Sequence, residues 1–151
     1  MNNHVWVTKL LMCAVVVLPF NSSVAQEDIR SKKHPVIGYW VLEAQEASCQ
    51  ETYQFNEDGS GQFTSGEEQL EIKYVVEAQP DETGFFKLTH QVVKTNGKPD
   101  CTKNVTQSNS SQVSYLLFQP DGYAYVACEN NDASLANCFG PLQLKARTKP
   151  D

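Results

Sequence analysis

Apolar and polar residues alternate with a period of two along most of this chain, and this constrains the fold more than any other feature. The clearest run covers residues 69–79, where one set of side chains is apolar and the other mostly charged: Leu70, Ile72, Tyr74 and Val76 alternate with Glu71, Lys73, Val75 and Glu77. Successive side chains of a strand point to opposite faces, so this pattern predicts a strand with one buried face. No segment shows a convincing helical stripe, and the predicted fold class is therefore all-β.

Eight runs of this kind follow one another, and several are separated by turn residues. Asp58-Gly59 and Pro120-Asp121-Gly122 are strong turn signals. One helical turn is expected at Ser134–Asn137. Short strands with local connections predict an antiparallel up-and-down barrel, because closure removes exposed strand edges. The predicted strands cover residues 36–42, 52–56, 61–64, 69–79, 85–94, 112–119, 123–128 and 142–147.

The connections sort into two groups. In an up-and-down barrel, successive connections alternate between the two ends. The second, fourth and sixth are all short: 57–60, 80–84 and 120–122. The others are 43–51, 65–68, 95–111 and 129–141, and three of these four are long. One end of the barrel is thus predicted to be tight, and the other to carry long loops of the kind that often serve function.

The N-terminus has the pattern of a secretory signal peptide over residues 1–25. An apolar run at Leu10–Leu18 is followed by Ser23-Val24-Ala25, which places small residues before a cleavage site. The run is shorter than the ~20 apolar residues that span a bilayer. A lipobox reading of Leu10–Cys13 is disfavoured because Met12 is bulky where that cleavage needs a small residue. We expect an exported protein, periplasmic or extracellular and not inserted in a membrane, with a flexible lead-in (26–35), a barrel domain (36–147) and a C-terminal tail (148–151).

The cysteine count supports export. Removal of residues 1–25 leaves four cysteines, and an even number in a small exported domain predicts two disulfides. Sequence alone allows three pairings. The favoured one joins Cys128 to Cys138 as a local loop closure and leaves Cys49 with Cys101. No C-x-x-C pair is present, so a zinc site is not predicted.

Gly38-Tyr39-Trp40 on the first predicted strand resembles the G-x-W signature of lipocalin-like (calycin) barrels. The resemblance implies that Trp40 closes the narrow end and that the odd-numbered connections surround an open cup. It also implies a late basic residue packed on the Trp, a role that Lys145 or Arg147 could fill. The long helix of lipocalins proper has no counterpart here. The segments 65–68 and 138–141 also resemble small bacterial exported proteins, a resemblance that implies no activity.

Charge limits the classes of partner. The mature chain carries 11 Lys and Arg against 18 Asp and Glu, a net charge of −7, so a nucleic-acid partner is not expected. Eleven acids and one base lie between Glu43 and Glu82. Predicted loops at the long-loop end carry Glu43, Glu46, Glu67 and Glu68. These acids are either a solvated face or an acidic mouth that attracts a cationic partner.

The aromatic residues on the strands either fill the core or line an apolar pocket in which tyrosine hydroxyls orient a ligand. His90 is in register with Phe86, Leu88 and Val92, so it is expected to face inward, whereas His34 is expected to be solvated in the lead-in. The candidate ligand-binding residues are Tyr53, Tyr74, His90, Tyr115 and Tyr125. No catalytic residue, metal site or cofactor is predicted.

Three functions fit these observations. The first is a non-enzymatic binding protein that holds a small apolar ligand in the barrel, and its mark is an interior larger than its side chains fill. The second is an inhibitor or immunity-type module that binds a protein through acidic, disulfide-stapled loops, and its mark is a filled interior. An enzyme that uses loop carboxylates or His90 is the least favoured. The sequence leaves the ligand, the partner and the oligomeric state open.

Overall fold

The computed structural model describes residues 33–42 and 49–147. The predicted signal peptide, most of the lead-in and the tail lie outside these ranges. Within them, no helix is long and apolar enough to cross a membrane. The elements are β1 (Gly38–Leu42), β2 (Glu51–Phe55), β3 (Ser60–Ser65), β4 (Glu68–Val76), β5 (Phe86–Thr95), β6 (Ser111–Phe118), β7 (Ala124–Cys128) and β8 (Cys138–Ala146).

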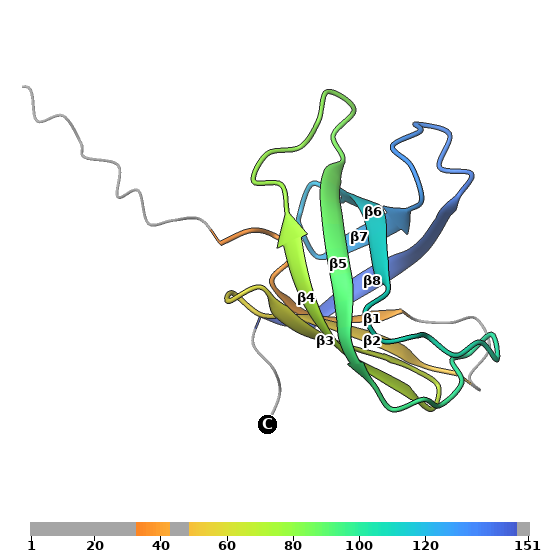
Figure 1. Cartoon of the computed structure of the whole chain (residues 1–151). Coiled ribbons are helices and arrows are strands. Elements are labelled where there is room, and N and C mark those ends of the chain that lie inside the picture. The colour runs from red at the N-terminus through yellow and green to blue at the C-terminus, as the bar shows by residue number, and fades with distance from the viewer. Residues whose placement is uncertain (1–32, 43–48, 148–151) are drawn as a thin grey trace, which may run out of the picture. The chain divides into compact units, whose positions relative to one another are not determined.

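The eight strands form a closed antiparallel barrel in sequence order (Figure 1). β1 pairs with β2 on one side and with β8 on the other, where Leu42 lies opposite Leu142. The predicted all-β barrel of about eight strands is therefore confirmed. β4 shows why the sequence folds this way, since its residues alternate strictly between buried and exposed up to Val75. Val75 itself is 74% exposed on the outer face.

Of the three connections predicted to be short, those after β2 and β6 are tight turns built from the expected residues, whereas the one between β4 and β5 covers residues 77–85 because β4 ends at Val76. Gly59 has a φ of 79° and Gly122 a φ of 70°, a region that glycine enters without strain. In each turn the preceding aspartate accepts a backbone N–H two residues later, Asp58 from Ser60 and Asp121 from Tyr123. Local chemistry therefore fixes the turns at this end of the barrel.

Trp40 plugs the end at which these short turns lie. Its side chain is fully buried, and its indole N–H donates a 2.7 Å hydrogen bond to the Val36 carbonyl. The ring of Tyr125 packs edge-on against it at 4.7 Å. Arg147 is the basic residue that covers Trp40, with its guanidinium 5.9 Å from the ring centroid. The same guanidinium donates to the carbonyls of Pro35, Ile37 and Gly122, so it ties three segments to the closed end.

His34 is half-buried rather than solvated, contrary to expectation. Its ring packs edge-on against Phe86 at 4.8 Å, and its Nδ1 accepts the N–H of Val36. Burial lowers its pKa, and the Glu77 backbone offsets part of that effect. The polar composition of the lead-in did not reveal this contact, which depends on an aromatic residue 52 positions later in the chain.

Two further expectations are wrong, both after β7. β8 begins at Cys138 rather than Leu142, and residues 133–137 form turns without a helix. Pro141 donates no backbone hydrogen bond, so its presence argued against a strand. The pairing of β7 with β8 is irregular between Tyr125 and Ala127, which is the kind of position where a strand tolerates proline.

The disulfides join Cys49 to Cys101 and Cys128 to Cys138. The favoured pairing is confirmed. Cys49–Cys101 attaches the long β5–β6 connection to the start of β2, and Cys128–Cys138 closes the β7–β8 connection across directly opposed strand residues. Such bridges are typical of proteins that fold in oxidising compartments.

We predict that Arg147→Met lowers the free energy of unfolding by about 1–2 kcal/mol, because it removes hydrogen bonds to three carbonyls and the contact with Trp40. Urea unfolding followed by tryptophan fluorescence measures the change. Lys87→Met on the exposed face of β5 removes the same charge and should change stability by less than about 0.5 kcal/mol. Equal effects of the two substitutions would contradict the role given to Arg147.

We also predict that the two disulfides stabilise unequally. They bridge sequence separations of 52 and 10, and loop-closure entropy gives stabilisations of about 4 and about 3 kcal/mol. The Cys49→Ser/Cys101→Ser variant should therefore unfold at lower urea concentration than Cys128→Ser/Cys138→Ser. The reverse order would show that loop length does not determine their contributions.

Candidate functional site

The interior of the barrel is not filled. A cavity of about 410 Å³ opens toward the long-loop end, which is within the range of ~300–1,000 Å³ typical of small-molecule sites. β6 explains part of the opening. Its residues 111–114 pair with β5, whereas its pairs with β7 begin only at Tyr115. The inner face of β6 thus continues beyond the end of β7 and forms one wall of the mouth.

One part of the cavity wall is apolar. Tyr53, Phe55 and Phe63 pack edge to face, with centroid distances of 4.9 Å and 5.4 Å to the ring of Phe63. Rings held this way present a rigid apolar surface. The carbon-rich lining comprises Tyr53, Phe55, Phe63, Leu70, Leu88, Val92, Leu116, Tyr125, Ala127 and Phe139.

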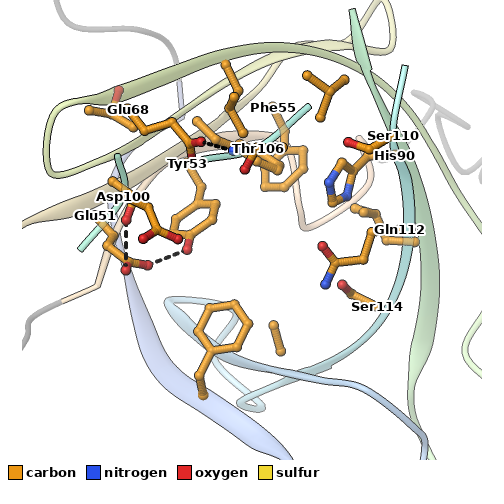
Figure 2. Close-up of a pocket in the computed structure, with 18 of the residues that line it drawn as sticks. Glu51, Tyr53, Phe55, Glu68, His90, Asp100, Thr106, Ser110, Gln112 and Ser114 are labelled. Carbon is orange, nitrogen blue, oxygen red and sulfur yellow. Dashed lines mark hydrogen bonds between the residues drawn. The ribbon is translucent and has the colours of Figure 1, made fainter. Parts of the chain in front are cut away.

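The rest of the cavity wall is polar, and its polar groups lie on two sides. Figure 2 shows Glu51, Asp100 and Glu68 on one side of the cavity, with His90 and Gln112 among the groups on the other. The polar lining comprises Glu51, Thr64, Ser65, Glu68, His90, Asp100, Thr106, Ser110, Ser111, Gln112 and Ser114.

Glu51 is held at the first position of β2 by two hydroxyls. Its Oε2 accepts a 2.5 Å hydrogen bond from the Tyr53 hydroxyl, and its Oε1 accepts one of 3.1 Å from Ser65 (Figure 2). Ser65 Oγ in turn accepts the backbone N–H of Cys101. The disulfide of Cys101 therefore fixes the chain that supports this carboxylate.

Glu68 is buried, with 3% of its surface exposed. Its Oε1 accepts the backbone N–H of Thr106 at 2.8 Å, which clasps the β5–β6 connection over the start of β4. Asp100 projects from that connection. Its Oδ1 accepts the backbone N–H groups of Thr102 and Asn104. Desolvation raises the pKa of Asp100, but these hydrogen bonds and the charge of Lys103 outweigh it and hold the pKa below its usual value.

Two tyrosine hydroxyls face this polar region. Burial raises the pKa of Tyr53 far above its usual value, and its hydrogen bond to Glu51 and the charges of Glu51 and Asp100 act in the same direction. Burial also raises the pKa of Tyr125, which is 2% exposed. Both groups remain protonated donors. Among the described residues, no hydrogen-bond partner is present for the Tyr125 hydroxyl, although the side chain lines the cavity.

His90 lies in the middle of β5 and packs edge-on against Phe63 at 5.2 Å. Its Nδ1 is buried and finds no hydrogen-bond partner within the described ranges. Burial lowers its pKa, so the ring is neutral at neutral pH. A neutral imidazole is a polar contact for a ligand and adds no positive charge to the cavity.

Three of the five candidate ligand-binding residues line the cavity: Tyr53, His90 and Tyr125. Tyr74 faces inward but lies at the closed end, where its hydroxyl donates to the Asn56 carbonyl at 2.6 Å. Burial and the charges of Asp58 and Glu57 raise its pKa to about 12. The alternation gave its face correctly, but alternation contains no information about depth in the barrel.

Tyr115 points outward, and its assignment to the cavity is wrong. The inward residues of β6 include Ser114 and Leu116, which line the cavity. Tyr115 pairs instead with Lys87, an exposed residue of β5. Both faces of β6 carry large apolar side chains, so alternation did not determine which face was buried.

The acidic residues also divide. Glu67 is exposed on the β3–β4 turn, whereas Glu68 faces into the cavity. Glu43 and Glu46 lie outside the described residues. Sequence reasoning missed Glu51 and Asp100. Glu51 could have been found from its register, since it lies two residues before Tyr53 on the same face of β2, but Asp100 reaches the cavity through loop geometry and a disulfide.

In the part of the chain that the structure describes, no group of three or more His, Cys, Asp or Glu is arranged to hold a metal ion. A second hollow of about 870 Å³ lies at the closed end, beside Lys33, Phe118 and Arg147. The chain continues beyond Lys33 and Arg147, so this hollow adjoins undescribed segments. The cavity inside the barrel is the better-defined site.

Comparison of the chain with protein-family models, with curated proteins and with solved structures finds no match in any of the three. Functional inference for this protein therefore rests on the cavity itself.

The lowered pKa of His90 predicts a pH dependence of stability. Below pH about 6.5, His90 in the unfolded chain binds a proton, whereas burial disfavours protonation of His90 in the folded chain. The contribution of His90 to the free energy of unfolding is therefore fully present above that pH and is lost as the pH falls toward the lowered pKa of the folded chain. His90→Gln should lose less stability than the wild type between pH about 7.5 and about 5.5, as measured by urea unfolding at each pH. His34, whose pKa is also lowered, contributes equally to both proteins. Identical losses in the two would contradict the burial of His90.

Proposed function

We propose that this protein is an exported, non-enzymatic binding protein that holds one small, largely apolar ligand in the barrel cavity. The single observation that carries the proposal is a cavity of about 410 Å³ inside a closed barrel. The aromatic and aliphatic part of its lining faces this space. An apolar ligand that enters from the long-loop end would remove that surface from water, which is favourable.

The composition of the wall supports a ligand with one polar end. Aromatic and aliphatic side chains form much of the lining, which also includes Tyr125, and the buried Nδ1 of His90 has no hydrogen-bond partner among the described residues. Buried polar groups usually form hydrogen bonds. A ligand whose polar atom reaches this nitrogen would satisfy it.

Export and the lipocalin-like resemblance support the same proposal. The two disulfides fit an oxidising compartment, to which the predicted signal peptide would direct the chain. The contact between Trp40 and Arg147 fits the resemblance carried by Gly38-Tyr39-Trp40. A carrier in a periplasm or medium requires a stable barrel and a cavity accessible from one end.

The alternative, a module that binds a protein through acidic stapled loops, is less well supported. That function requires no internal space, and a filled interior would have favoured it. Val105 and Leu135 are exposed in the β5–β6 and β7–β8 connections, and single exposed apolar side chains are common on protein surfaces.

The proposal predicts that filling the cavity abolishes binding. N-phenyl-1-naphthylamine, a neutral fluorescent probe, should bind the purified mature chain saturably with a stoichiometry of one. Ser114→Trp, which places an indole in the cavity from β6, should weaken binding by at least about tenfold.

Val113→Trp is the matched control, since Val113 is 40% exposed on the outer face of the same strand. It should leave probe affinity within about twofold of the wild type. Urea unfolding of both variants establishes that each is folded. Equal probe binding by the two folded variants would place the probe on the surface and contradict the proposed site.

A further inference from the structure

The charges on the cavity wall narrow the ligand class. The described side chains that line the cavity include the carboxyl groups of Glu51, Glu68 and Asp100, and no Lys or Arg is among them. Lys103 is close enough to lower the pKa of Asp100, but it does not line the cavity. His90 is neutral at neutral pH. The interior therefore favours positive charge.

Among the described residues, no ion pair involves Glu51 or Glu68. Glu51 accepts hydrogen bonds from the hydroxyls of Tyr53 and Ser65, and Glu68 accepts one from a backbone N–H. These donors are neutral. The two ion pairs found between described residues, Lys33–Glu57 and Lys94–Glu71, are exposed and involve neither glutamate. A buried carboxylate is usually paired with a positive charge, and among the described residues no Lys or Arg lines the cavity to provide one.

An independent feature points to a ligand at the same place. Tyr125 is 2% exposed and lines the cavity, and its hydroxyl has no partner among the described residues. Tyr53, whose hydroxyl donates to Glu51, lines the same cavity. The oxygen of the Tyr125 hydroxyl can accept a hydrogen bond from an ammonium group, so this side chain offers a polar ligand head a second contact in the cavity that Glu51 lines.

The apolar wall sets the rest of the ligand. The rings of Tyr53 and Phe63 lie against the polar region, and aromatic faces attract organic cations. The side chains of Leu88, Val92 and Leu116, which line the same cavity, present a purely aliphatic surface. A fully hydrated inorganic cation would leave this surface unfilled. For a metal ion bound directly by the protein, the described residues provide no group of three or more His, Cys, Asp or Glu arranged to hold it.

We infer that the cargo is an organic monocation, an alkyl or arylalkyl amine whose protonated nitrogen lies between Glu51 and Glu68 and whose apolar body fills the barrel. The inference rests on the proposed function, since it assigns the chemical class of the ligand in that same cavity. No bond is made or broken. The amine is bound as it arrives, and the carboxylates select for its charge.

The test uses three probes with the same eight-carbon body: octylamine, 1-octanol and octanoate. Each is titrated against the mature full chain at neutral pH and low ionic strength by isothermal calorimetry, with displacement of N-phenyl-1-naphthylamine as a second readout. Octylamine should bind at least about tenfold more tightly than 1-octanol, and octanoate more weakly than both.

Glu51→Gln and Glu68→Gln separate the charge from the cavity. In Glu68→Gln the remaining oxygen can accept the Thr106 N–H. In Glu51→Gln one oxygen still accepts from a hydroxyl, and the amide nitrogen that replaces the other can donate to the second hydroxyl. Both variants should lose about tenfold in octylamine affinity and retain 1-octanol affinity within about twofold. Glu67→Gln, one residue from Glu68 and exposed, removes the same charge from the surface and should leave both affinities unchanged.

The possible results distinguish the two levels of the argument. Equal affinities for octylamine and 1-octanol, or a preference for octanoate, would overturn the assignment of a cation while the cavity remained a binding site. Equal losses in Glu67→Gln and Glu68→Gln would attribute the preference to overall charge and would also overturn it. Failure of all three probes to bind or to displace the fluorescent probe would count against both the cation and the proposed function.

Discussion

Closure of the sheet between β1 and β8 is the constraint on which the rest of this structure depends. A barrel of eight strands has room inside for side chains or for one small ligand. Here Trp40 of the closing strand fills the narrow end, with its indole bonded to Val36. Arg147, directly after β8, lies over that ring and holds the N-terminal segment and the β6–β7 turn. One end is thereby sealed, and the unfilled volume lies toward the other.

The open end depends on a different set of restraints. Residues 111–114 of β6 pair with β5 but not with β7, whose pairing with β6 begins at Tyr115. This part of β6 therefore forms a wall of the cavity beyond the end of β7. The β5–β6 connection covers part of this region. It is attached by the disulfide at Cys101, by Thr106 on Glu68, and by Asn96, whose side chain bonds the backbone of Glu67 and Gln69. The loop that carries Asp100 is therefore part of a fixed site.

The same restraints lower the free-energy cost of burying the glutamate carboxylates in the cavity, compared with carboxylates that have no hydrogen-bond partner. Each glutamate accepts hydrogen bonds that also position the chain, Glu51 from Tyr53 and Glu68 from Thr106. Hydrogen bonds to carboxylates are stronger than those between neutral groups. These groups thus have a structural role in the barrel itself and a charge that remains available to a ligand.

Much of the fold could be predicted from the sequence, because strand alternation, turn residues and cysteine number are local features. The inward-facing residues could be predicted wherever the other face of the strand was clearly polar, as for His90 on β5. They failed on β6, where Val113 and Tyr115 made the outer face as apolar as the inner one. Depth was also inaccessible, so Tyr74 and Tyr53 appeared equivalent although they lie at opposite ends. Asp100 and the packing of His34 required contacts between distant parts of the chain.

The central claim is that the barrel holds a small molecule, and native mass spectrometry of the mature protein tests it most directly. The protein should be purified under mild conditions from an oxidising compartment of its own host. The account predicts one reproducible non-covalent adduct at a stoichiometry of one, lost on denaturation and absent from Ser114→Trp. A bare mass for the wild type, or the same adduct on Ser114→Trp, would contradict it.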